Sequence, residues 1–326
     1  PICAGRRERG AGRGLNGGGA SVIRRARKDR IPGMTAPIVT SIPPVFSRKD
    51  AAGQEIGDAY LGRCIASWRA CGFEPVTVNA EAEELHPLIA ALDVQVVRVP
   101  RDARALTGRP HVYLADLLDA ARRLSAERVF IVNADIELEM SDTARDRLAR
   151  LGPMETVGVR RRDHGGEKSL ATPPYECGID LLGAGQEALD GIDAGTLVFG
   201  MPWWDHYLPL RLLWRGAQVV PCPEVRAWHL DHDGRWNKQQ YVSSGREFLQ
   251  LVEGTPAPMR RDPWVDAHVA GLARIRRGHY GASPPRRIEA RLLAALMPRS
   301  YTQARRVLRE TSLSNIALLD RLAGGA

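Results

Sequence analysis

One short segment concentrates side chains that could bind a metal ion. Residues 229–233 read His-Leu-Asp-His-Asp and follow a strand-like stretch. Imidazole nitrogens and carboxylate oxygens are the usual protein ligands of divalent cations. A single histidine at such a place is most often structural, whereas two histidines and two aspartates at the end of a strand favour a metal or catalytic site. The candidate ligands are His229, Asp231, His232 and Asp233.

A second polar segment, Asn133-Ala134-Asp135, directly follows the apolar run 130–132. A carboxylate at the point where a buried strand leaves its sheet can coordinate a hard divalent cation, which takes oxygen ligands and bridges phosphates. Such a cation could neutralise the charge that develops on a diphosphate leaving group. An isolated aspartate at a strand end is also typical of a turn or a helix cap, so both roles stay open for Asp135.

The third candidate segment is Trp203-Trp204-Asp205, placed by Pro202 in the first turn of a predicted helix. Neighbouring residues on a helix point about 100° apart, so we expect one of the two tryptophans to line a cleft, where it could support a sugar ring. Asp205 is suited to two roles. A carboxylate caps and stabilises a helix N-terminus, and it can also act as the base that removes a proton from an acceptor hydroxyl.

Alternating apolar runs and amphipathic stretches must position these segments. Strands alternating with helices of 10–15 residues predict βαβ units and a Rossmann-like, mainly parallel sheet flanked by helices, an α/β fold. Ligands of such sheets bind beyond the carboxyl ends of the strands. The predicted strands are 38–42, 75–79, 94–99, 128–132, 156–160, 179–182, 218–220 and 225–229, and the predicted helices are 57–71, 82–92, 112–124 and 202–213.

The net charge of +8 is concentrated at the two ends of the chain. Residues 1–33 carry nine basic and two acidic residues, and residues 270–326 carry eleven and three. The remaining 34–269 carry 26 basic and 33 acidic residues. The body of the protein is therefore acidic, and no nucleic-acid partner is expected for it.

Composition divides the chain into three predicted regions. Eight of the first 33 residues are glycine and show no periodicity, which predicts a disordered segment ahead of a native start at Met34. The Arg-rich C-terminal region is predicted to be helical, with an apolar stripe that packs on the body or makes a peripheral membrane contact. The regions are 1–33, 34–255 and 256–326, the last with its stripe at Ile288, Leu292 and Leu296.

Cysteine usage and hydropathy bear on the compartment. The five cysteines lack paired CxxC spacing, which predicts reduced thiols and a cytoplasmic protein, with neither a disulfide framework nor a zinc ribbon. The sequence contains no run of about 18 uncharged apolar residues, so no transmembrane segment is expected.

The order of these pieces over residues 36–250 resembles the A-type glycosyltransferases, the nucleotide-diphospho-sugar transferases, and within them a poorly characterised bacterial subgroup with a Trp-Asp helix and a His-rich strand end. The resemblance implies a nucleotide-sugar donor, a glycan or small-molecule acceptor, and a divalent metal, Mn²⁺ or Mg²⁺. It also implies a catalytic domain at 34–255, with a nucleotide half at 34–140 and an acceptor half at 141–255. Finally, it implies roles for individual residues. These are Asn79, Asn133, Asp135 and Trp204 as contacts of the nucleotide-sugar, Asp135, His229 and His232 as metal ligands, and Asp205 as the catalytic base.

The sequence departs from the family pattern at one position, and two alternative functions stay open. The commoner acidic motif has aspartate where this chain has Asn133, although asparagine can also ligate a hard cation through its carbonyl oxygen. A metal-dependent hydrolase could use His229, Asp231 and His232, a pattern similar to half of the metallo-β-lactamase motif. A non-catalytic binding protein on the same fold is the other alternative.

Overall fold

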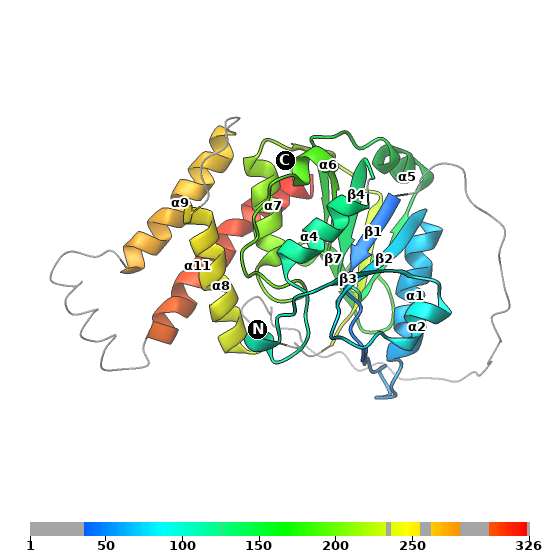
Figure 1. The fold of residues 1–326 in the computed structure, drawn as a ribbon. Coiled ribbons are helices and arrows are strands. Elements are labelled where there is room, and N and C mark those ends of the chain that lie inside the picture. The colour runs from blue at the N-terminus through cyan, green and yellow to red at the C-terminus, as the bar shows by residue number, and fades with distance from the viewer. Residues whose placement is uncertain (1–35, 125, 233–235, 255–261, 281–299, 325–326) are drawn as a thin grey trace.

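The fold is described from a computed structural model of the chain, which covers residues 36–124, 126–232, 236–254, 262–280 and 300–324 (Figure 1). Several sequence predictions lie outside these residues. They are the disordered segment 1–33, the start at Met34, the candidate ligand Asp233, and the stripe formed by Ile288, Leu292 and Leu296.

Seven strands form the central sheet, in the order β3-β2-β1-β4-β8-β6-β9. The strands β1 to β4 run parallel to one another, whereas β8 runs antiparallel to both β4 and β6. The predicted α/β class with a mainly parallel sheet is confirmed. The bounds are β1 Ala36–Thr40, β2 Phe73–Ala80, β3 Gln95–Val99, β4 Arg128–Val132, β6 Glu155–Val159, β8 Leu181–Gly185 and β9 Gln218–Val219.

Side-chain alternation gives this sheet two apolar faces. Ile38 and Phe130 belong to one buried cluster, and their neighbours Val39 and Ile131 belong to the other, as the two-residue period of a strand requires. Helices α1 and α5 contribute to the first cluster, and α4, α6 and α7 contribute to the second (Figure 1). The helices are α1 Gly57–Ala70, α2 Pro87–Ala91, α3 Arg104–Thr107, α4 Leu114–Arg123, α5 Asp142–Ala149, α6 Gln186–Leu189, α7 Trp204–Trp214, α8 Lys238–Gly254, α9 Pro263–Tyr280 and α11 Ser300–Leu322.

A second, three-stranded sheet has the order β5-β10-β7, with bounds Ile136–Met140, Val225–Leu230 and Arg161–His164. Strand β10 is antiparallel to β5 and parallel to β7. The register places Asp163 beside His229 and His164 beside Leu230. Because successive side chains of a strand point to opposite faces, Asp163 and His229 share one face of this small sheet, and His164 and Leu230 share the other.

Helix α7 begins at an unusual backbone turn. Trp203 has a φ of 85°, a left-handed conformation that is rare for a bulky residue and persists only where surrounding contacts hold it. Its indole Nε1 donates to the carbonyl of Tyr241 at 3.0 Å, and its ring packs against that of Phe248. The turn places Asp205 in the first turn of α7.

Both tryptophans at this turn are buried, at 1% exposure for Trp203 and 2% for Trp204. The expectation that one of them lines a cleft is therefore wrong. The left-handed turn explains the difference, since it sends Trp203 toward α8 while Trp204 packs on Phe199, with ring centroids 4.7 Å apart.

The C-terminal helices α8, α9 and α11 lie together on the α7 side of the sheet (Figure 1). Asn315 of α11 is fully buried and links α11 to both α7 and α9. Its side chain contacts His206 of α7 at 3.2 Å and His268 of α9 at 2.9 Å. These buried polar contacts fix how α11 sits on the body.

Cys64, Cys71 and Cys222 are buried free thiols. Within the described part of the chain, no helix is both long enough and apolar enough to span a membrane.

Candidate functional site

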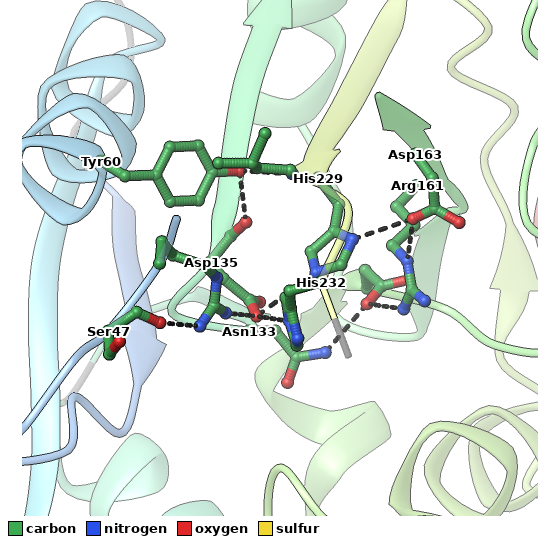
Figure 2. Close-up of polar contacts among 11 residues, drawn as sticks. Ser47, Tyr60, Asn133, Asp135, Arg161, Asp163, His229 and His232 are labelled. Atoms are coloured by element: carbon green, nitrogen blue, oxygen red, sulfur yellow. Dashed lines mark hydrogen bonds and ion pairs between the residues drawn. The ribbon is translucent and has the colours of Figure 1, made fainter. Parts of the chain in front are cut away.

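Asp135, His229 and His232 converge beyond the carboxyl end of β4 (Figure 2). The Nε2 atoms of both histidines lie 3.5 Å from Oδ2 of Asp135. One potential ligand atom from each of the three side chains lies within 4.8 Å of the other two. Of the residues that the structure describes, this is the group with the composition and spacing to hold a divalent cation.

Asp163 orients the His229 ring by contacting the nitrogen that faces away from Asp135. Its Nδ1 lies 2.9 Å from Oδ1 of Asp163, so an Nδ1–H donated to this carboxylate leaves Nε2 directed at Asp135. Burial alone would lower the pKa of His229, but the neighbouring carboxylates of Asp135 and Asp163 outweigh it and raise that pKa to about 9. An imidazole held by a carboxylate in this way is characteristic of metal-binding histidines.

Two further residues hold Asp135 in place. Arg48, whose side chain is 2% exposed, forms an ion pair with the Asp135 carboxylate, and its Nη1 donates to the carbonyl of Ser47 at 2.8 Å. The Tyr60 hydroxyl donates to the backbone carbonyl of Asp135 at 2.9 Å and accepts from the N–H of Leu230 at 2.8 Å. Tyr60 thereby ties the end of β4 to β10, which keeps the three candidate ligands together.

A series of polar contacts continues from the candidate metal ligands to Arg161 and Asn133 (Figure 2). Arg161 donates through Nε to Oδ1 of Asp163 at 2.8 Å and through Nη1 to Oδ1 of Asp180 at 3.1 Å. Asn133 donates through Nδ2 to the same Asp180 oxygen at 2.9 Å. The Asn133 side chain therefore connects the predicted acidic motif to Asp180, a contact that the sequence did not reveal.

Asp205 lies next to these polar contacts and is only partly accessible to solvent. Burial, followed by the negative charge of Asp180, raises the pKa of Asp205 to about 7. Gly178 makes room for it, since a Cβ on that residue would lie 2.4 Å from Oδ2 of Asp205. A carboxyl group that titrates near neutral pH can accept a proton there in a reaction, which is the property of a general base.

The raised pKa of Asp205 predicts a measurable dependence of stability on pH. In the folded protein the pKa of Asp205 is about 7, whereas the pKa of an aspartate in the unfolded chain is about 3.9. The free energy of unfolding therefore falls as pH rises through this window. We expect Asp205→Asn to gain about 1–3 kcal/mol relative to the parent protein between pH 5 and pH 8 in urea unfolding, because part of the shift is screened by solvent. An equal difference at both pH values would contradict the shift.

Two residues predicted to contact the nucleotide-sugar are engaged in the core. Asn79 is fully buried, and its Nδ2 donates to the carbonyl of Ile42 and to Glu83, each at 2.9 Å. Trp204 is packed on Phe199. Neither belongs to the group around Asp135.

Two residues of the alternative hydrolase site, His229 and His232, belong to the converging group, and the third member of that group is Asp135. Asp231 donates its backbone N–H to the carbonyl of His164 at 2.9 Å.

Four contributing residues were missed from the sequence: Arg48, Tyr60, Arg161 and Asp163. Arg48 follows the first strand in a stretch without periodicity. Asp163 and Arg161 belong to a strand of four residues, Arg-Arg-Asp-His, which has the composition of a loop. The pairing of β7 with β10 is the signal that identifies them, and it exists only in three dimensions.

Asp163 provides a test of the metal site that spares its ligands. Asp163→Asn keeps the size of the side chain and an acceptor for His229, but it removes the charge that orients the ring. We expect Mn²⁺ affinity to fall about 10–100-fold, the usual cost of losing such an orienting partner, as measured by titration calorimetry. Asp142→Asn, a change at an exposed carboxylate, serves as the control and should bind Mn²⁺ like the parent. Equal affinities in both variants would contradict the orienting role.

No protein-family model matches the sequence, and no curated protein sequence does. Among solved structures, the chain is similar to GalNAc-T7 with UDP, GalNAc and Mn²⁺, at 12% identity and a TM-score of 0.45, over 75% of this chain and 51% of GalNAc-T7. This chain thus spans about half the length of that protein. It is also similar to a nucleotidyl transferase from Methanothermobacter thermautotroptrophicus, at 13% identity and a TM-score of 0.33, over 68% and 99% of the two chains.

A third solved structure is described as mannose-1-phosphate geranyltransferase from Thermus thermophilus, at 14% identity and a TM-score of 0.27, over 66% and 79% of the two chains. At these identities and TM-scores the likenesses carry no conclusion about the activity, which has to be inferred from the residues of this chain.

Proposed function

We propose that the chain is a glycosyltransferase that moves a sugar from a nucleotide-diphospho-sugar to a hydroxyl acceptor with the help of a divalent metal. The observation that supports this most is the convergence of Asp135, His229 and His232 beyond the carboxyl end of β4, the side of a parallel sheet on which α/β enzymes bind ligands. Asp135 belongs to the proposed nucleotide half 34–140, and the histidines belong to the acceptor half 141–255, so the site would join the two halves.

The donor set fits a divalent cation. One carboxylate and two imidazoles form a mixed oxygen and nitrogen set, which suits Mn²⁺ better than Mg²⁺, because Mg²⁺ prefers oxygen ligands alone. Asp135, His229 and His232 would hold the cation. Its contribution when bound is positive charge beside the diphosphate leaving group.

The protein supplies further positive charge of its own. Arg48 is a buried cation in contact with Asp135, and it follows the first strand of the nucleotide half. A guanidinium group binds phosphate oxygens well because its N–H donors form a planar fork. We therefore assign to Arg48 the binding of the diphosphate next to the metal ligands.

Asp205 would serve the acceptor. Its pKa of about 7 makes it partly ionised at neutral pH, so that it can take the proton of an acceptor hydroxyl as the oxygen attacks the sugar. A dedicated base of this kind suits a single displacement with inversion at the anomeric carbon. The acceptor would be a glycan or a small molecule with a hydroxyl group.

A thermal-shift panel of nucleotide diphosphates and nucleotide-sugars, each with and without Mn²⁺ or Mg²⁺, tests the proposal. A ligand that binds only the folded state stabilises it by about 2.7 kcal/mol at 100 times its Kd, so one member of the panel should raise the melting temperature, and more so with Mn²⁺. Binding without sugar transfer would favour a non-catalytic binding protein. If none of these ligands raises the melting temperature and the zinc-loaded protein hydrolyses an ester, the hydrolase would be favoured.

A further inference from the structure

We propose that Arg161 is a shared positioning residue, which holds Asp163 behind the proposed metal ligand His229 and holds the buried Asp180 on the side of Asp205. The inference rests on the proposed function only in calling Asp205 the base. Arg161 acts on each of these two groups through one intervening carboxylate.

The geometry on the metal side is a chain of two contacts. Nε of Arg161 and Nδ1 of His229 both lie on Oδ1 of Asp163, at 2.8 and 2.9 Å. The Asp163 carboxylate is thus held between a guanidinium and an imidazole (Figure 2). Held by both groups, Asp163 keeps the His229 ring turned toward Asp135.

The geometry on the acceptor side depends on the buried Asp180. Its exposure is 3%, and Arg161 is the cation that pairs with its Oδ1, at 3.1 Å. The other oxygen, Oδ2, is buried without a hydrogen-bond partner among the described residues. Arg161 therefore offsets only part of the charge of Asp180, and the remainder disfavours a second negative charge on Asp205.

Asp205 is surrounded by groups from several elements that bear on its charge. Asp180 precedes β8, Arg161 lies on β7, and Tyr175 lies in the loop between them, with the Arg161 guanidinium 4.1 Å from the centre of its ring. Tyr241 faces it from α8. Since burial raises the pKa of both tyrosines above its usual value, they stay neutral, and Asp180 and Arg161 are the charged pair that governs Asp205.

Three variants of the full-length protein separate the two effects. Asp163→Asn should weaken Mn²⁺ binding about 10–100-fold and leave the titration of Asp205 unchanged. Asp180→Asn should lower the midpoint of the Asp205 titration by about one pH unit or more and leave Mn²⁺ affinity unchanged. Arg161→Met should change both quantities. It should weaken Mn²⁺ binding, as Asp163→Asn does, and it should raise the midpoint of the Asp205 titration, whereas Asp180→Asn lowers it.

The measurements need neither a donor nor turnover. Titration calorimetry with Mn²⁺ alone gives the metal affinity. Carbon-13 NMR of carboxyl-labelled aspartate, assigned with Asp205→Asn, gives the midpoint of Asp205. Far-ultraviolet circular dichroism on every variant verifies that it is folded.

Arg161→Lys distinguishes positioning from simple loss of structure. Lysine keeps the positive charge but lacks the fork that reaches two carboxylates at once. We expect it to restore the midpoint of Asp205 most of the way while Mn²⁺ binding stays weak. The proposal is overturned if Arg161→Met shifts only one of the two quantities, or if Asp163→Asn and Asp180→Asn each shift both. A positive result here with no response in the nucleotide panel would reject the proposed transferase activity and leave the role of Arg161 standing.

Discussion

An Asp205→Asn enzyme is expected to lose turnover by a factor of about 10²–10⁴ while its donor affinity stays within about a factor of two. Asparagine keeps the shape of the side chain and an oxygen that can accept from the first N–H groups of α7. What it lacks is the ability to take a proton from the acceptor. Steady-state kinetics with the donor identified in the nucleotide panel, together with calorimetric donor binding, provides the measurement.

The control for this substitution is Asp190→Asn, an exposed aspartate at the end of α6, which should behave like the parent. Because the pKa of Asp205 is raised by burial and by Asp180, the asparagine variant should also be more stable than the parent above pH 7. A residue that costs stability and supports turnover is the combination expected of a catalytic group. Near-normal turnover in Asp205→Asn would leave Asp205 with a structural role only, in the first turn of α7.

Loss of one proposed metal ligand is expected to reduce metal affinity strongly. His229→Ala removes one of the three proposed ligands and leaves the Asp163 carboxylate without its imidazole partner. We expect Mn²⁺ affinity to fall by more than the about 10–100-fold that an orienting residue costs. Metal-dependent stabilisation by the nucleotide should disappear with it, which calorimetry and thermal shift would both record.

His164→Ala is the matched control for His229→Ala. His164 lies on the neighbouring strand of the same small sheet but on its opposite face, and it is likewise buried. Its removal should leave Mn²⁺ affinity unchanged. If both alanine variants bind Mn²⁺ equally well, the cluster around Asp135 is a structural polar network and not a metal site.

The sequence predicts those candidate site residues that follow a strand in the chain. Asp135 and His229 were predicted because an apolar run followed by a polar residue marks the end of a buried strand. Asp205 was predicted because proline and tryptophan mark the start of α7. The main strands of the central sheet were predicted for the same reason, since each has the apolar pattern of a buried strand.

The residues that orient these groups could not be predicted from local pattern. Asp163 meets His229 across 66 positions of sequence, and Arg48 meets Asp135 across 87. Strand β7 is polar and only four residues long, so neither periodicity nor propensity distinguishes it from a loop. The two buried tryptophans were misjudged because the left-handed backbone at Trp203 changes the direction that an ordinary helix start would give them.

The three-stranded sheet also determines when the site can form during folding. Strand β10 pairs with β5, and the Tyr60 hydroxyl bonds to Leu230 across 170 positions, so both contacts are of high sequence separation. Contacts of this kind form late, because the entropy of closing a long loop must be overcome first. A growing chain that ends before β10 can pair β1 to β4 but lacks both candidate histidine ligands. Metal capture would therefore report that β10 has docked, because His229 lies on this strand and His232 follows it.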